Sequence, residues 1–97
     1  MSGGDWKEML YAAENGDLEL VKYHVKMGVD INYQHPELLT TALIESTRYG
    51  REAVVKFLLE KGADPAAKAV MGGETALDVA KVYQHKAIAK LIQSFLS

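Results

Sequence analysis

The stretch that decides the fold occurs in two versions: residues 50–64 read GREAVVKFLLEKGAD, and residues 16–30 read GDLELVKYHVKMGVD. The two versions start 34 residues apart, because 50 − 16 = 34. The same offset carries the Thr-Ala-Leu of residues 41–43 onto that of residues 75–77. A fixed period of this length predicts a repeat architecture, in which no unit buries its own apolar face and neighbouring units must stack.

The composition is that of one small globular domain. The 97 residues are 48% apolar and 25% charged, which allows a single hydrophobic core. The formal net charge of −2 gives no electrostatic reason to expect a nucleic acid or an anionic membrane as a partner. The absence of cysteine is compatible with the cytoplasm. Because the chain also shows no secretory signal and no apolar run of about 20 residues, we expect it to be cytoplasmic.

Each repeat predicts two helices. In the second helix of the middle repeat, Val54, Val55, Leu58 and Leu59 form one apolar stripe. Gly62 then ends that helix, since glycine adopts a left-handed conformation at little cost. The predicted helices cover residues 5–15, 18–27, 41–49, 52–61, 75–83 and 85–96.

Capping residues mark the start of the first helix in each repeat. Thr75, with Asp78 three residues later, predicts a capping box. Asp5 is also followed three residues later by an acid, which predicts the same pattern at the first helix. One of the threonines at 40 and 41 is expected to cap the middle helix.

These residues resemble the pattern of a known protein family. The pattern V-V-x-x-L-L-x-x-G-A-D-P at residues 54–65, together with the Thr-Ala-Leu openings and the alanine pair at 12–13, is similar to the ankyrin repeat. The resemblance runs from about Trp6 to Leu96 as three units. It implies an all-α, ankyrin-type helical solenoid of three helix-pair repeats with protruding inter-repeat loops. The single domain would span 1–97, with repeats at about 5–32, 41–66 and 75–97.

The chain departs from the family pattern in two ways. Its period is one residue longer than the family's usual one, which leaves regular β-hairpin geometry open for the loops at 33–40 and 67–74. The family's T-P-L-H opening also lacks its proline and histidine here. The hydrogen bonds which that histidine makes between repeats must therefore be supplied by other residues or be absent.

A search for catalytic residues returns no candidate. His24, His35 and His85 are scattered over two helices and a loop, without a neighbouring nucleophile or acid in a known motif. We expect His24 to be half-exposed on the outer side of the first repeat. The glycines at 72–73 lack the strand and the lysine of a phosphate-binding loop, and no metal-ligand spacing appears. We predict no enzyme activity, no cofactor and no metal.

The remaining candidate for function is the surface. In an ankyrin-like stack the first helices and the loop tips line one concave face, which we predict to bind a partner protein, because tyrosine and arginine are favoured at such contacts. Packing at helix ends is an equal alternative for Tyr49 and Tyr83. Leu38 and Leu39 either form an exposed apolar patch or pack under the next helix. The predicted contact residues are Tyr11, Glu14, Tyr33, His35, Glu45, Arg48, Tyr49, Met71, Val79, Val82 and Tyr83.

A second function stays open beside partner binding. Three repeats are near the minimum for a stable solenoid, so the chain could instead be a self-associating or structural subunit that homo-oligomerisation stabilises. The sequence does not identify the partner.

Overall fold

The computed structural model describes residues 5–69 and 72–96, and within these ranges the secondary-structure elements are helices joined by loops, without strands. Each end of each helix lies within one residue of its predicted position. The all-α prediction is therefore confirmed. The helices are α1 (Trp6–Asn15), α2 (Leu18–Lys26), α3 (Ala42–Arg48), α4 (Glu52–Glu60), α5 (Ala76–Val82) and α6 (Lys86–Leu96).

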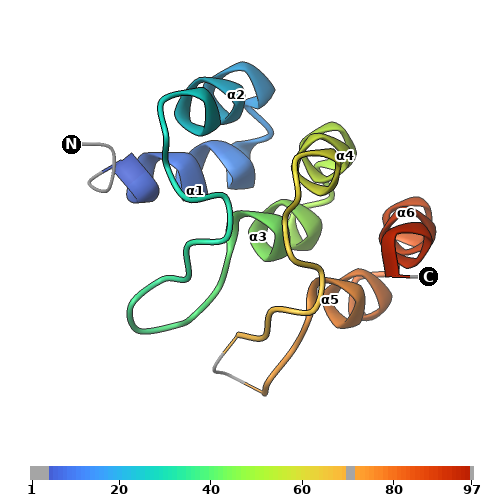
Figure 1. Cartoon of the computed structure of the whole chain (residues 1–97). Coiled ribbons are helices and arrows are strands. Elements are labelled where there is room, and N and C mark those ends of the chain that lie inside the picture. The colour runs from blue at the N-terminus through green and yellow to red at the C-terminus, as the bar shows by residue number, and fades with distance from the viewer. Residues whose placement is uncertain (1–4, 70–71, 97) are drawn as a thin grey trace.

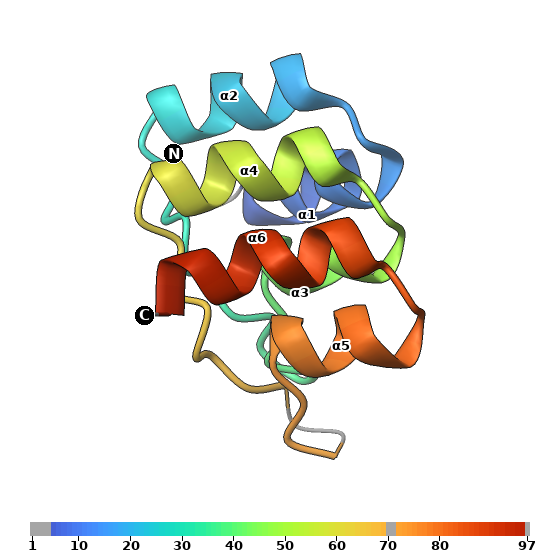
Figure 2. The same ribbon diagram turned by 90° about the vertical axis from the view of Figure 1, so that its right-hand side faces the viewer.

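The helices form two layers (Figure 1). Helices α1, α3 and α5 lie side by side as the inner layer, and α2, α4 and α6 lie against them as the outer layer. The view turned by 90° shows the outer helices running nearly parallel (Figure 2). Two loops project from the inner-layer side; we call them the first finger (33–40) and the second finger (67–74 without residues 70–71, which are not described).

The hydrophobic core is one continuous seam between the layers. Val55, Leu58 and Ile92 of the outer helices have no exposed surface. Inner helix α3 contacts α1, α4 and α5, and all its residues before Arg48 are buried. Burying a leucine or isoleucine side chain contributes about 1.5–3 kcal/mol. No repeat buries its apolar face alone, so each repeat contributes to this shared seam and is stabilised by its neighbours.

Hydrogen bonds between repeats are present, although the family's usual histidine is missing. Arg51 Nε donates to the carbonyl of Glu14 over 2.8 Å, and His85 Nε2 lies 3.2 Å from the carbonyl of Arg48. Arg51 and His85 are 34 residues apart, as 85 − 51 = 34, and so are the two acceptors. The same position of successive repeats therefore contacts the end of the preceding inner helix.

These contacts explain the glycines at the ends of α1 and α3. Gly16 has a φ of +74° and Gly50 a φ of +72°, which a side chain rarely tolerates. A Cβ atom on Gly16 would lie 2.9 Å from Arg51 Cδ, and one on Gly50 would lie 2.9 Å from His85 Cε1. Glycine is needed both for the backbone conformation and for the approach of the next repeat.

Each finger is closed by the same backbone hydrogen bond. His35 N donates to Thr40 O over 2.9 Å, and Ala69 N donates to Glu74 O over 2.9 Å. Neither finger has strand structure in its described residues, so the fingers are hairpin-like but form no β-ladder there. The question that the longer period left open is thus answered for the first finger and for the described residues of the second, while residues 70–71 lie outside the described part of the chain.

The predicted helix caps are confirmed at two of three helices. Thr75 and Asp78 form the capping box of α5, and the Thr41 hydroxyl accepts a hydrogen bond from Ile44 N at α3. The capping prediction for Asp5 is wrong, because its side chain makes no cap hydrogen bond. The acid three residues later bonds to another helix instead.

That acid is Glu8, and its partner is His24. Glu8 Oε1 lies 2.8 Å from His24 Nε2, which links α1 to α2. The prediction that His24 is half-exposed is wrong, because only 1% of it is exposed. His24 occupies the core position that Leu58 and Ile92 fill in the other repeats, and its bond to Glu8 allows a polar ring to be buried there.

Candidate functional site

A groove runs along α1, under the first finger, to α3 and the start of α5. It consists of a hollow of about 270 Å³ and an adjoining one of about 200 Å³. Leu10, Glu14 and His35 line both hollows, so we treat them as one inner groove. The larger hollow adds Leu38, Thr40, Glu45, Arg48, Ala69 and Glu74, and the smaller one adds Trp6, Lys7 and Tyr11.

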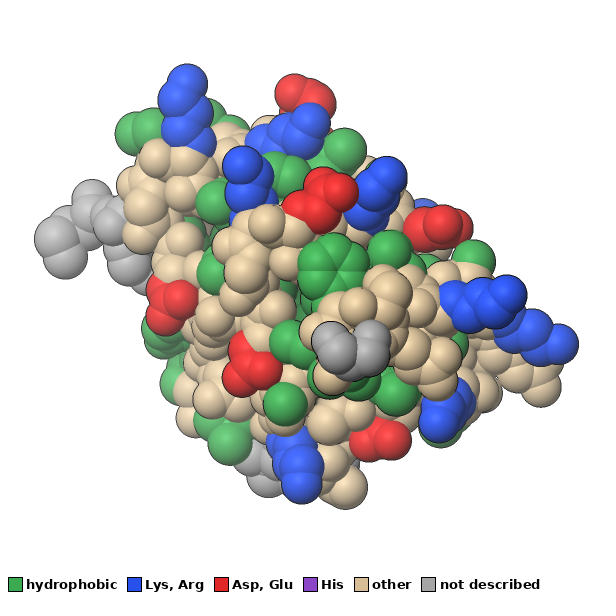
Figure 3. All heavy atoms as spheres, turned by 45° about the vertical axis from the view of Figure 1, so that its right-hand side comes forward, with side chains coloured by type: hydrophobic (Ala, Val, Ile, Leu, Met, Phe, Trp, Pro, Cys, Tyr) green, Lys and Arg blue, Asp and Glu red, His purple; other side chains and the backbone are tan. Residues whose placement is uncertain are grey.

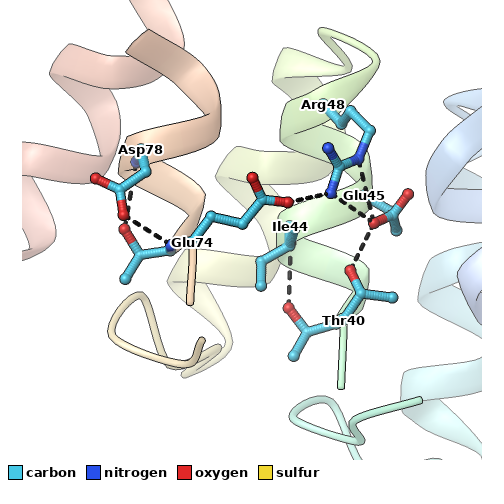
Figure 4. Close-up of polar contacts among 8 residues, drawn as sticks. Thr40, Ile44, Glu45, Arg48, Glu74 and Asp78 are labelled. Atoms are coloured by element: carbon cyan, nitrogen blue, oxygen red, sulfur yellow. Dashed lines mark hydrogen bonds and ion pairs between the residues drawn. The ribbon is translucent and has the colours of Figure 1, made fainter. Parts of the chain in front are cut away.

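Arg48 is the centre of a polar network in the larger hollow (Figure 4). Its guanidinium reaches from α3 to Glu74, just before α5, where Nη2 and Oε1 are 2.8 Å apart. The same nitrogen lies 3.4 Å from Glu45 Oε2, which also accepts a hydrogen bond from the Thr40 hydroxyl. Burial lowers the pKa of Arg48, but the hydrogen bond with Glu74 and the charge of Glu45 outweigh burial and raise that pKa.

Glu14 lies where the two hollows meet. Its carboxylate forms no ion pair and accepts no hydrogen bond from the described part of the chain. Partial burial, together with the negative charge of Glu45, raises the pKa of Glu14, and the charge of Arg48 only partly offsets this. The groove therefore contains an acid whose charge nearby Arg48 compensates only in part.

Aromatic contacts hold the first finger against α1. The Trp6 ring stacks on Tyr33 with centroids 5.0 Å apart and meets His35 edge-on at 5.3 Å. His35 Nδ1 accepts hydrogen bonds from the backbone N–H groups of Glu37 and Leu38, which places the ring proton on Nε2. The wall of the groove is thus fixed by stacking and by local hydrogen bonds.

Most predicted contact residues are accessible to a partner. Tyr11 and Val82 are strongly exposed, Tyr49 and Tyr83 are about half exposed, and the partly buried Glu14, Tyr33, His35 and Arg48 lie on the groove or the first finger. Leu38 is exposed as well, and it lines the groove rather than packing under α3. Leu39 is also exposed.

For three predicted contact residues the structure does not show an accessible side chain. Val79 is wrong as a contact, because its side chain points into the core and none of it is exposed. Glu45 is nearly buried, so only its carboxylate, already bound to Arg48, reaches the groove. Met71 lies outside the described residues.

The sequence reasoning missed Trp6, Thr40 and Glu74. All three line the groove, and they stand at the same position of successive repeats, since 6 + 34 = 40 and 40 + 34 = 74. The period itself was a signal that could have identified them as a row.

Figure 3 shows the molecule turned by 45°, so that the side on which α4, α5 and α6 lie in Figure 1 comes forward. Lys and Arg side chains alternate there with Asp, Glu and apolar ones, and no single sign of charge dominates the view. Among residues 5–69 and 72–96, no group of three or more His, Asp or Glu side chains could hold a metal ion. No helix of that same part is long and apolar enough to cross a membrane.

Stacked pairs of antiparallel helices with fingers on one side define a helical repeat protein. The family model for ankyrin repeats, described as three copies, matches residues 9–95. The chain therefore belongs to the ankyrin repeat family. Ankyrin repeats are in general protein–protein interaction modules, and the repeat is a non-catalytic fold.

Curated relatives agree with this assignment. The chain is 40% identical over 62 residues to Palmitoyltransferase AKR1 of Lachancea kluyveri, which is 64% of the chain and 8% of the relative. It is 35% identical over 79 residues to Ankyrin repeat and SAM domain-containing protein 6 of Rattus norvegicus, or 81% of the chain and 9% of the relative. Putative ankyrin repeat protein FPV031 of Fowlpox virus is 36% identical over 74 residues, or 74% of the chain and 21% of the relative. The chain thus spans less than a tenth of the first two relatives.

Proposed function

We propose that this chain is a cytoplasmic protein-interaction module, with one ankyrin domain over 1–97, that binds a partner protein through its inner groove and fingers. The inner groove is the observation that supports this proposal most. It combines charged, aromatic and apolar side chains on a frame of packed helices. Such a concave surface with a few convergent polar groups is the usual form of a binding site.

The exposed tyrosines add to this support. Tyr11 lines the groove and is 67% exposed, and Tyr49, at the end of α3, is 51% exposed. Tyrosine carries a large apolar ring and a polar hydroxyl, so it contributes strongly when a partner covers it. Because the ring projects from a rigid helical frame, little conformational entropy is lost when a partner binds it.

The test removes these rings without disturbing the fold. We would make the double variant Tyr11→Ser and Tyr49→Ser, and as a matched control Tyr23→Ser on outer helix α2, where the ring is 53% exposed. The measurement is affinity capture from the native cell extract with quantitative mass spectrometry. We expect the double variant to capture about tenfold less of a partner protein than the natural chain does. The control should retain that partner.

A partner that binds both variants equally, or that only Tyr23→Ser removes, would contradict the assignment to the inner layer. Circular dichroism and urea unfolding of each variant must show that the fold is kept. Without that control, a loss of binding could reflect unfolding.

Self-association is the alternative function. Val82, Phe95 and Leu96 on the third repeat are large apolar residues that remain exposed, and a second copy could cover them. Sedimentation over roughly a hundredfold range of protein concentration would show a rising mass for an oligomer. A constant monomer mass would exclude this alternative.

A further inference from the structure

We propose that the inner groove takes up a positively charged side chain, lysine or arginine, from a segment of the partner protein, and that Glu14 and Glu45 flank its charged group. This inference rests on the proposed function, because it specifies the chemistry of the partner that the same groove would bind.

The charges of the larger hollow favour a cation. Glu14, Glu45 and Glu74 line it with Arg48 as the one arginine or lysine, so with His35 neutral its formal charge is 1 − 3 = −2. Arg48 is already held by Glu74 and Glu45. Lys7 lines only the smaller hollow and lies over the Trp6 ring, 5.6 Å from the centroid.

Glu14 is the carboxylate that an incoming cation would pair with. It has no partner within the described residues, whereas Glu45 and Glu74 both bind Arg48. Its backbone carbonyl accepts from Arg51, which fixes the end of α1 and so the place from which the side chain projects. Burial raises the pKa of Glu14 most and the charge of Glu45 adds to this; a bound cation would offset the repulsion from Glu45.

The walls of the groove fit the rest of a basic side chain. Leu38 offers exposed apolar surface for its methylene groups, which long basic side chains bury while the charge stays paired, and the largely buried Leu10 and Ala69 also line the hollow. The exposed Tyr11 ring stands at the adjoining hollow, where an aromatic face can attract a cation. A phosphate backbone would instead meet three carboxylates, which argues against a nucleic acid.

The experiment is a titration of the isotope-labelled protein, followed by amide chemical shifts, with N-acetylarginine methylamide as the probe. N-acetylnorleucine methylamide, which keeps the apolar stem but lacks the charge, is the reference probe. We expect the arginine probe to shift the amides of Glu14, His35 and Leu38, and the norleucine probe to leave them unmoved. Equal shifts with both probes, or none with arginine, would overturn the inference.

Glu14→Gln is the decisive variant, since it removes the charge and keeps the shape. It should weaken binding of the arginine probe by about fivefold or more. Glu19→Gln on α2, where the carboxylate side chain is 86% exposed, is the matched control and should leave binding unchanged. Unchanged binding in Glu14→Gln would overturn the inference.

Comparing how the tyrosine double variant and Glu14→Gln capture the partner protein distinguishes a failure of this inference from a failure of the proposed function. If the tyrosine double variant loses that partner while Glu14→Gln retains it fully, the groove binds a protein but not through a cation at Glu14. If neither variant affects the partner, the proposed function fails as well. Loss with both variants, together with the arginine-specific shifts, supports both.

Discussion

His24 fills a core position with a polar ring whose hydrogen-bonding capacity is only half used. Nε2 is bonded to Glu8, but Nδ1 is buried and has no partner among the described residues. An unpaired buried polar atom costs about 1–3 kcal/mol. Leu58 and Ile92 show that an aliphatic side chain fits the same position. We therefore expect His24→Leu to raise the free energy of unfolding by about 1 kcal/mol in urea denaturation.

Two companion variants check the reason for this effect. Glu8→Ala leaves His24 Nε2 without its partner and should lower stability by about 1–2 kcal/mol. In the His24→Leu background the same Glu8 change should cost much less. If His24→Leu itself destabilises the protein, the explanation from the unpaired nitrogen is wrong.

The raised pKa of Glu14 predicts a dependence of stability on pH. Because this pKa is higher in the folded than in the unfolded state, the folded protein binds more protons in that range, and stability falls as the pH rises through it. Glu14→Gln should thus be more stable than the natural chain at neutral pH, and the difference should vanish in acid, where Glu14 is neutral. Urea unfolding at a series of pH values measures this. An increasing advantage of the variant in acid would contradict the assignment.

Single residues were predictable where their partner is close in the sequence. Thr75 and Asp78 cap α5 as expected, because both groups belong to one helical turn. The same spacing failed at Asp5, since Glu8 has a partner on α2 that no local pattern reveals. The burial of His24 follows from that same long-range bond.

At the scale of elements, α5 ends in a conformation that suits glycine better than its own residue. Gln84 has a φ of +60°, where α1 and α3 have glycine, and the left-handed region costs a side chain about 1–2 kcal/mol. The turn is nevertheless closed by His85 N donating to Ala80 O over 2.8 Å. Gln84→Gly should stabilise the protein by about 0.5–1 kcal/mol, which for a domain of this size raises the melting temperature by about 2–8 °C.

The reverse change at the matching position is the control. Gly50→Gln imposes the same strain and also drives a side chain against His85, so it should destabilise by about 2 kcal/mol or more. A calorimetric scan that shows no gain for Gln84→Gly would mean that the αL strain is relieved by contacts of the glutamine.

Helix positions were predictable to within one residue, because apolar stripes and terminal glycines are local signals. The fingers were not. Each finger is closed by a backbone hydrogen bond. The first finger also depends on the hydrogen bonds to the His35 ring and on the stacking of Tyr33 against Trp6, which lies far away in the chain. The predicted contact residues included Glu14 and Arg48, but the groove that they line together with the first finger became visible only in the structure.

At the scale of the whole molecule, each repeat is stabilised by its neighbours, so protection should be uneven along the stack. Inner helix α3 is covered by α1, α4 and α5, whereas α6 contacts only α4 and α5 among the helices with extensive contacts. In native-state hydrogen exchange we expect the α3 amides to exchange only by global unfolding and the α6 amides to exchange faster through partial opening.

The ion pair between Arg48 and Glu74 joins the second repeat to the third, so removing it tests whether the third repeat can open separately in hydrogen exchange. Both side chains are partly exposed, so solvent screening limits their pair to about 0.5–1 kcal/mol. Glu74→Gln should therefore speed exchange in α5 and α6 by about two- to fivefold while leaving α1 and α2 unchanged. Uniform acceleration over all six helices would show instead that the three repeats unfold as one cooperative unit, in which no interface can open alone.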